Sequence, residues 1–147
     1  MMSSVTQDRP YSQTLTRLRE AGLRPTRQRL ALGRLLFDGG DRHVTAEALH
    51  EEAQAAGVSV SLATVYNTLH QFTEAQLLRE VVVDSARTYF DTNVSDHHHF
   101  FLENSGSLMD IDGDKIAVTG LPQAPEGTDV ARVDVIVRLH GAPRQAS

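Results

Sequence analysis

Apolar residues recur at helical spacing through the first half of the chain, and three of the runs begin at a residue that can cap a helix. The clearest run follows Ser61, where apolar side chains return every three or four residues at Leu62, Val65, Leu69 and Phe72. Similar runs follow Thr26 and Thr45, and a thinner one covers residues 11–21. The pattern therefore predicts four helices.

After the fourth helix the pattern changes to short alternating or apolar runs between turn residues. It predicts four strands, at residues 78–83, 87–90, 100–103 and 108–111. A last strand is predicted where Val133, Val135, Val137 and Leu139 alternate with other residues. The glycines and prolines of residues 120–127 are too frequent for a helix. Helices followed by strands indicate an α+β fold.

The polar face of the helix after Ser61 carries almost no charge. Its groups are small or form hydrogen bonds: Ala63, Thr64, Tyr66, Asn67, Thr68, His70 and Gln71. Such groups suit base edges in a DNA major groove, although an ordinary exposed helix face has the same composition. Two short helices, this helix and a hairpin together predict a winged helix-turn-helix.

Charge is distributed unevenly along the chain. The net charge is −5, yet residues 1–37 hold seven arginines against two acidic residues, which leaves this segment at +5. A basic segment on an acidic protein can face phosphates, and a solvated arginine-rich helix is the alternative.

The composition limits the possible chemistry. No cysteine is present, which excludes disulfides, thiolate zinc sites and a thiol nucleophile, so any metal ion must be held by nitrogen and oxygen. No long apolar run or signal peptide is recognisable, so we expect a cytoplasmic protein. A chain of 147 residues suits one ordinary domain or two small ones. Because small domains often need a partner for stability, we expect a homo-oligomer.

Three adjacent histidines follow Asp96 and precede an apolar run. If this stretch is a strand, His97 and His99 lie on one face, and His98 lies on the other face with Asp96. A bound ion or cofactor would explain the cluster, and a solvated polar loop rich in histidine is the alternative.

Four segments occur in the order found in a known family: residues 23–29, 43–49, 63–69 and the histidine run. They resemble the ferric uptake regulator (Fur) superfamily. Residues 66–72 and 89–93, the run His97–Phe101 and the lack of cysteine are most similar to its iron response regulators (Irr). The chain departs from most relatives at Asn67, where they have Arg, and at Leu102 and Ser105, where they have paired cysteines for a structural zinc ion.

The resemblance implies a homodimer of two-domain chains. Residues 1–91 would be a winged-helix DNA-binding domain, and residues 92–147 a dimerisation and sensing domain. The helix usual in the family's dimerisation domain would be short here, at 114–119, because of the glycines and prolines that follow it. The DNA contacts that it implies are Arg24, Ser61, Thr64, Tyr66 and Asn67. It implies a divalent ion, Fe(II), Zn(II) or Mn(II), held between the domains by His43, Asp91, His97, His99 and Asp110.

Haem is a second implied cofactor, with imidazole ligands from His97, His98 or His99. A second metal site would use Asp96 and His98, whereas His140 fits the end of an exposed strand. The implied function is a regulator, mainly a repressor, that controls haem-biosynthesis and iron-homeostasis genes at an AT-rich operator. Whether haem or iron promotes or releases DNA binding is open.

Four alternatives are kept. One is a conventional Fur-type repressor that iron, zinc or manganese activates, and another is a peroxide-responsive relative. A hydrolytic metalloenzyme would need a motif such as HExxH, a nucleophile elbow or a phosphate loop, none of which the sequence shows, so no enzyme is expected. A metal-storage or protein-interaction module would tolerate replacement of Tyr66 and Asn67.

Overall fold

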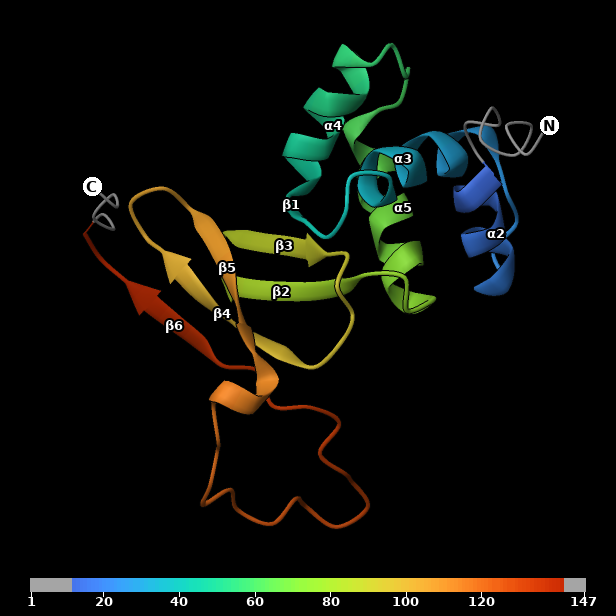
Figure 1. Cartoon of the computed structure of the whole chain (residues 1–147). Helices are drawn as coiled ribbons and strands as arrows, with labels where there is room; N and C mark the ends of the chain where they lie inside the picture. The colour runs from blue at the N-terminus through green and yellow to red at the C-terminus, as the bar shows by residue number, and fades with distance from the viewer. Residues whose placement is uncertain (1–11, 142–147) are drawn as a thin grey trace, which may run out of the picture. The chain divides into compact units, whose positions relative to one another are not determined.

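The computed structural model describes residues 12–141. It divides between Val94 and Ser95 into two compact units, called unit 1 and unit 2 below, and each is described by itself (Figure 1). The N-terminal residues 1–11, with the first residue of the first predicted helix, and residues 142–147 lie outside the described residues. No described helix is long and apolar enough to cross a membrane.

Unit 1 begins with the helices that the sequence predicts: α2 (Ser12–Glu20), α3 (Arg27–Phe37), α4 (Ala46–Ala55) and α5 (Leu62–Glu74). The predicted caps are confirmed. Thr26, Thr45 and Ser61 each accept a hydrogen bond from the backbone N–H three residues later, at 3.1–3.2 Å. Each cap satisfies one of the donors that a helix start leaves without an intrahelical partner, so these polar residues fix where the helices begin.

The helices of unit 1 enclose one apolar core. It joins Leu18 of α2, Leu32 and Leu36 of α3, Leu49 of α4, and Val65, Leu69 and Phe72 of α5. All of these side chains are fully buried. The apolar stripe of α5 thus faces the core. Its polar side is left toward solvent except for Thr68, which is buried.

A three-stranded antiparallel sheet completes unit 1, with the strand order β1-β3-β2. Its strands are β1 (His43–Val44), β2 (Arg79–Asp84) and β3 (Arg87–Asp91). The hairpin of β2 and β3 is the one predicted from the sequence. The two-residue strand β1 was not predicted, and it places His43 directly opposite Asp91.

Unit 2 is a second three-stranded sheet, with the order β5-β4-β6. It consists of β4 (His97–Leu102), β5 (Ser107–Asp112) and β6 (Ile136–Leu139), and the 3-10 turn η1 (Gly113–Lys115) follows β5. The histidine run is therefore a strand, with His97 and His99 buried and His98 between them on the other face, as the alternation predicts.

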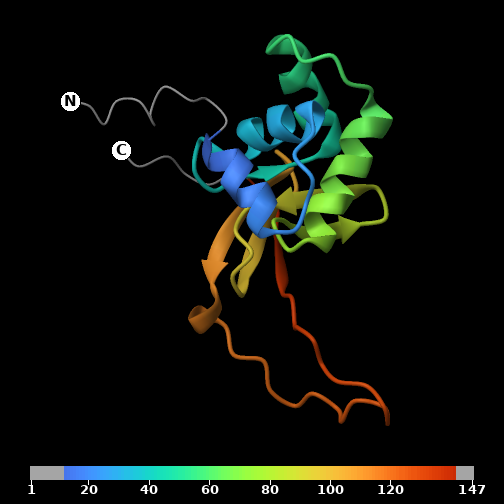
Figure 2. The same ribbon diagram turned by 90° about the vertical axis from the view of Figure 1, so that its right-hand side faces the viewer.

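The predicted helix at 114–119 is wrong. Only η1 forms, and residues 116–135 run outward and back as an extended loop without helix or strand (Figure 2). Ile116, Val118 and Thr119 are β-branched, which disfavours a helix, and Asp112 makes no side-chain cap to η1. The last strand also starts later than predicted, because the N–H of Val135 bonds to the imidazole of His98 rather than to a backbone carbonyl.

Candidate functional site

A histidine and a buried carboxylate face each other in unit 1. Because His43 and Asp91 are cross-strand neighbours in the pairing of β1 with β3, their side chains emerge side by side. Nε2 of His43 lies 3.2 Å from Oδ2 of Asp91. The other carboxylate oxygen accepts the N–H of Asn93 at 2.9 Å. A carboxylate that is fully buried needs such partners, since burying it alone would be costly.

Two buried imidazoles and one carboxylate meet in unit 2. The strand β4 puts His97 and His99 on one face, and the pairing of β4 with β5 puts Asp110 opposite His99. Oδ1 of Asp110 lies 3.5 Å from Nε2 of His97 and 3.4 Å from Nε2 of His99. The imidazoles are only 4% and 2% exposed, whereas the Asp110 side chain is 38% exposed. The two imidazoles of the set are thus buried, and its carboxylate is open to solvent.

Backbone contacts distinguish His97 from its neighbour His98. Nδ1 of His97 faces the carbonyl of Ser95 at 2.7 Å, so it carries the ring proton and leaves the lone pair on Nε2. That arrangement is usual for metal-binding histidines. In His98 the roles of the two ring nitrogens are reversed, because Nδ1 accepts the N–H of Val135 at 3.1 Å. A neutral His98 then carries its proton on Nε2 and offers no lone pair for a metal ion.

The spacing of these groups fits an ion. Two ligands that are each about 2.1 Å from a metal lie about 3.4 Å apart at the tetrahedral angle and about 3.0 Å apart at a right angle. The contacts of Asp110 in unit 2, at 3.4–3.5 Å, match the first value and are too long for good hydrogen bonds. The contact in unit 1, at 3.2 Å, lies between the two values. Imidazole with carboxylate suits Fe(II), Mn(II) or Zn(II).

The two residues predicted for a second metal site lie differently. Asp96 and His98 border a cavity of about 520 Å³ in unit 2, together with Asp114, Arg132 and apolar side chains. Within the described part of the chain, no cluster of three metal-binding side chains includes either residue. Their role as ligands stays a prediction, and the proton position in His98 argues against it.

The predicted DNA contacts lie at the surface of unit 1. Tyr66 and Asn67 are exposed on α5, Ser61 caps that helix, and Thr64 is half-buried one turn along it. Arg24 is exposed in the segment before α3, and its carbonyl accepts a hydrogen bond from Arg29 at 2.8 Å. Their function as DNA contacts stays a prediction.

Contacts around α5 add two partners that sequence reasoning missed. The Tyr66 hydroxyl donates to Oε2 of Glu47 on α4 at 2.7 Å. The bond lowers the pKa of the Glu47 carboxyl and raises the pKa of the Tyr66 hydroxyl. Arg29 holds the side-chain oxygen of Gln71 through two nitrogens, at 3.0 and 3.3 Å. No periodicity within one helix reveals these contacts, because each joins two helices.

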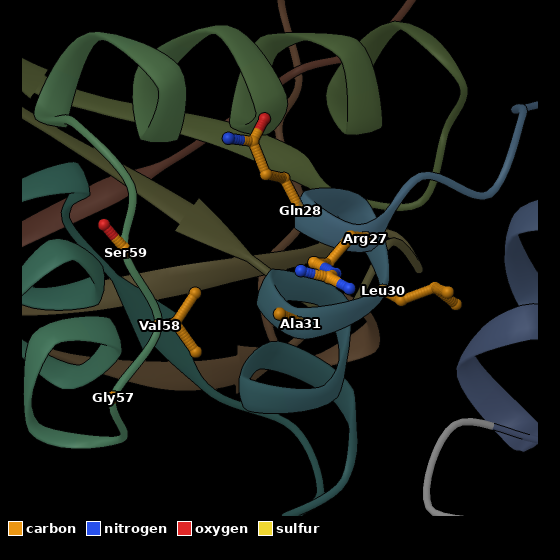
Figure 3. A pocket seen from close by; sticks show the side chains of 7 residues that line it. All are labelled: Arg27, Gln28, Leu30, Ala31, Gly57, Val58 and Ser59. Carbon is orange, nitrogen blue, oxygen red and sulfur yellow. The ribbon is translucent and has the colours of Figure 1, made fainter.

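One hollow on unit 1 takes no part in these sites. It has a volume of about 640 Å³ and lies between the start of α3 and the loop that leads to α5 (Figure 3). Its lining residues are Arg27, Gln28, Leu30, Ala31, Gly57, Val58 and Ser59. It contains no imidazole and no carboxylate, so it cannot hold a metal ion in the way that the two sets above can.

Several curated relatives with sequence similarity are named as peroxide regulators. The chain is 36% identical to the peroxide operon regulator of Bacillus subtilis over 98 residues, which cover 67% of each protein. It is 30% identical to the peroxide-responsive repressor PerR of Staphylococcus epidermidis over 103 residues, which cover 70% of this chain and 68% of the relative. Neither of these relatives is named as an iron response regulator, so they do not support the finer resemblance to that group.

Solved structures share the fold. The ferric uptake regulator of Pseudomonas aeruginosa, solved with manganese, superposes with a TM-score of 0.67 at 24% identity, over 88% of this chain and 98% of the other. That of Vibrio cholerae gives 0.68 at 19% identity, over 87% and 99%. The sequence model of the ferric uptake regulator family matches residues 20–137. The chain therefore belongs to the ferric uptake regulator family.

Proposed function

We propose that this protein is a metal-responsive, DNA-binding transcription regulator that acts as a homodimer. The observation that carries the proposal is the set of His97, His99 and Asp110, in which buried imidazoles turn Nε2 toward a shared carboxylate at ligand spacing. Membership in the ferric uptake regulator family supports the same proposal. We assign the protein no catalytic reaction.

Unit 1 is the proposed DNA reader. Its order of α3, α4, α5 and the β2–β3 hairpin is that of a winged helix-turn-helix, in which α5 would enter the major groove. The exposed Tyr66 and Asn67 would contact base edges there, and Arg24 would contact phosphates. The fully buried opposite face of α5 would hold the helix on a rigid support.

The metal centre combines both sets of ligands in this proposal. The pair His43 and Asp91 alone offers two ligands, and the unit 2 set offers three, so the sequence prediction that all five serve one ion gives an ordinary coordination number. A divalent ion would supply the positive charge that compensates the carboxylates. Binding of this ion would hold the ligands in one arrangement. The supply of metal would thereby control the arrangement of the ligands and, through that arrangement, DNA binding.

Two candidates exist for the effector that controls DNA binding. Peroxide is favoured by the similarity to peroxide-responsive repressors at 30–36% identity. Iron with haem is the main prediction from the sequence and is supported by the residues of the histidine run, as the similarity to the iron response regulators implies. The proton position in His98 reduces the haem ligands of that run to His97 and His99, which are also the proposed metal ligands.

One titration distinguishes them. DNA bound by the protein is first selected from a random duplex library with Mn(II) present and again without metal. Binding to the selected operator is then followed while Fe(II), Zn(II), haem or hydrogen peroxide is added to separate samples. Loss of binding on peroxide addition to the Fe(II) form supports the first effector, and a change with haem alone supports the second.

Matched variants locate the response. The double variant H97A/H99A should lose it, whereas H140A, which removes an exposed histidine of the same unit, should retain it. A response that survives in H97A/H99A rules out the proposed centre. For the DNA surface, Arg24→Ala should weaken binding to all duplexes and flatten the salt dependence, while Asn67→Ala should weaken the operator more than random DNA. Equal losses on both duplexes for Asn67→Ala would contradict the role given to α5.

A further inference from the structure

The bond between Tyr66 and Glu47 fixes which way the tyrosine hydroxyl points its proton. A phenol has one O–H to donate. Glu47 lies in the exposed first turn of α4, and its pKa is lowered, so at neutral pH its carboxylate can only accept. At 2.7 Å the Tyr66 proton is therefore committed to Glu47. The hydroxyl oxygen keeps its lone pairs and can accept one more hydrogen bond, but it has no proton left to give.

Both partners of this bond are held by rigid elements. Glu47 follows the capping residue Thr45 at the start of α4. The ring of Tyr66 stacks on the imidazole of His70, with centroids 6.4 Å apart and planes 20° apart. His70 in turn meets the buried Phe90 edge-on at 5.6 Å. Two contacts thus fix the position of the Tyr66 hydroxyl. One is the hydrogen bond to the Glu47 carboxylate, and the other is the stacking of the Tyr66 ring on His70, which itself contacts the buried Phe90.

Bases differ in what they offer to such an oxygen. In the major groove, adenine and cytosine present amino donors, whereas guanine and thymine present acceptors at the corresponding positions. We propose that Glu47 makes Tyr66 an acceptor-only reader, which selects adenine or cytosine over guanine or thymine at one position of the operator. Tyr66 touches the base, and Glu47 is a positioning residue. The inference rests on the proposed function, because it assumes that α5 lies in the major groove.

Glu47 has a second, opposing effect that the experiment must separate. Its negative charge near bound phosphates weakens binding to every sequence, so its removal strengthens non-specific binding. Glu51 lies one turn further along α4, is exposed, and has the same charge without the bond to Tyr66. Glu51→Ala is therefore the matched control for charge, and Glu47→Ala removes the charge and the hydrogen-bond acceptor together.

The test uses the full-length protein with Mn(II) and its selected operator. Each adenine is replaced by purine, and each cytosine by 2-pyrimidinone, which deletes one amino group at a time. Loss of one hydrogen bond should weaken wild-type binding about fivefold at a single position. Tyr66→Phe should show no loss there. Glu47→Ala frees the Tyr66 proton, so the hydroxyl can donate as well as accept, and the preference for adenine or cytosine over guanine or thymine at this position should fall. Glu51→Ala should keep the wild-type preference. In solution, Glu47→Ala should also lower the pKa of the Tyr66 hydroxyl, as followed by ultraviolet absorbance.

Each outcome of the base-substitution test supports or overturns the inference. The inference is overturned if Tyr66→Phe loses the same affinity as the wild type at every amino deletion, or if Glu47→Ala keeps the preference for adenine or cytosine over guanine or thymine unchanged. A protein that selects no operator overturns the proposed function and this inference with it. An operator recognised with the same preference by Tyr66→Phe overturns the inference alone.

Discussion

The two units of the chain differ in what fills their interiors. Unit 1 holds fourteen of the sixteen buried hydrophobic side chains among the described residues, and twelve of these form one cluster. In unit 2 the buried hydrophobic residues are Phe101 and Leu102, and two of its other buried side chains are the imidazoles of His97 and His99. Unit 1 is built around an apolar core, and unit 2 around a polar set.

This difference suggests where stability comes from. Burial of apolar surface stabilises unit 1 whether or not an effector is present. Unit 2 has to place imidazoles and a carboxylate at ligand spacing with little apolar burial to offset the cost. Its stability should therefore depend on what those groups bind, which is a useful property in a sensor.

The largest test of the comparison is Phe72→Ala in α5. Phe72 is fully buried and its ring centroid lies 6.1 Å from that of Phe37, so its truncation should cost about 3–5 kcal/mol of the stability of unit 1. Chemical denaturation followed by circular dichroism measures the loss. Met109→Ala in unit 2, where the side chain is 51% exposed, is the control and should cost almost nothing. A loss below about 1 kcal/mol for Phe72→Ala would contradict an apolar core for unit 1.

Metal removal is the next test, and it should affect the other unit. An ion at a hundred times its dissociation constant adds about 2.7 kcal/mol to the state that binds it. Chelation should therefore reduce amide-exchange protection in β4 and β5, and leave the amides of α3 and α5 protected. His99→Ala should show the low protection with or without metal. Uniform loss across both units would mean that unit 1 also needs the ion, and the contrast drawn above would be wrong.

The same contrast explains what the sequence could and could not predict about the fold. In unit 1, caps at Thr26, Thr45 and Ser61 and an apolar stripe on α5 are local signals, and the helices begin where those signals predict. In unit 2, Ile116, Val118 and Thr119 are β-branched and Asp112 makes no side-chain cap, and the predicted helix is absent. The two-residue strand β1 was missed because so short a strand has no pattern of its own.

The candidate site was predictable only in part. Alternation along β4 placed His97 and His99 on one face. Asp110, which the pairing of β4 with β5 brings opposite His99, came from the family resemblance. The residues His43 and Asp91 came from the family resemblance, because their pairing depends on β1. The proton positions of His97 and His98, and the bond between Glu47 and Tyr66, need coordinates, since each depends on a contact between elements distant in sequence.

A smaller effect is expected from Gly113→Ala in η1. A Cβ at this position would lie 2.7 Å from the backbone oxygen of Asp96, so the backbone next to His97 must shift. We expect a loss of about 1–3 kcal/mol in unit 2 and weaker metal binding, measured by denaturation and by metal titration. Gly39→Ala in unit 1 meets open space and is the control. Unchanged metal affinity in Gly113→Ala would show that the strand start tolerates displacement, and that unit 2 holds its ligands less rigidly than its geometry indicates.

The smallest effect concerns a polar defect inside unit 1. Thr14 of α2 is buried, and its hydroxyl has no hydrogen-bond partner among the described residues. Valine has nearly the same shape without the unsatisfied oxygen, so Thr14→Val should raise the stability of unit 1 by about 0.5–1 kcal/mol. Thermal unfolding measures the gain, and the response of unit 2 to metal should stay the same. Destabilisation would mean that the hydroxyl is satisfied in solution, and that the core of unit 1 is less purely apolar than its contrast with unit 2 implies.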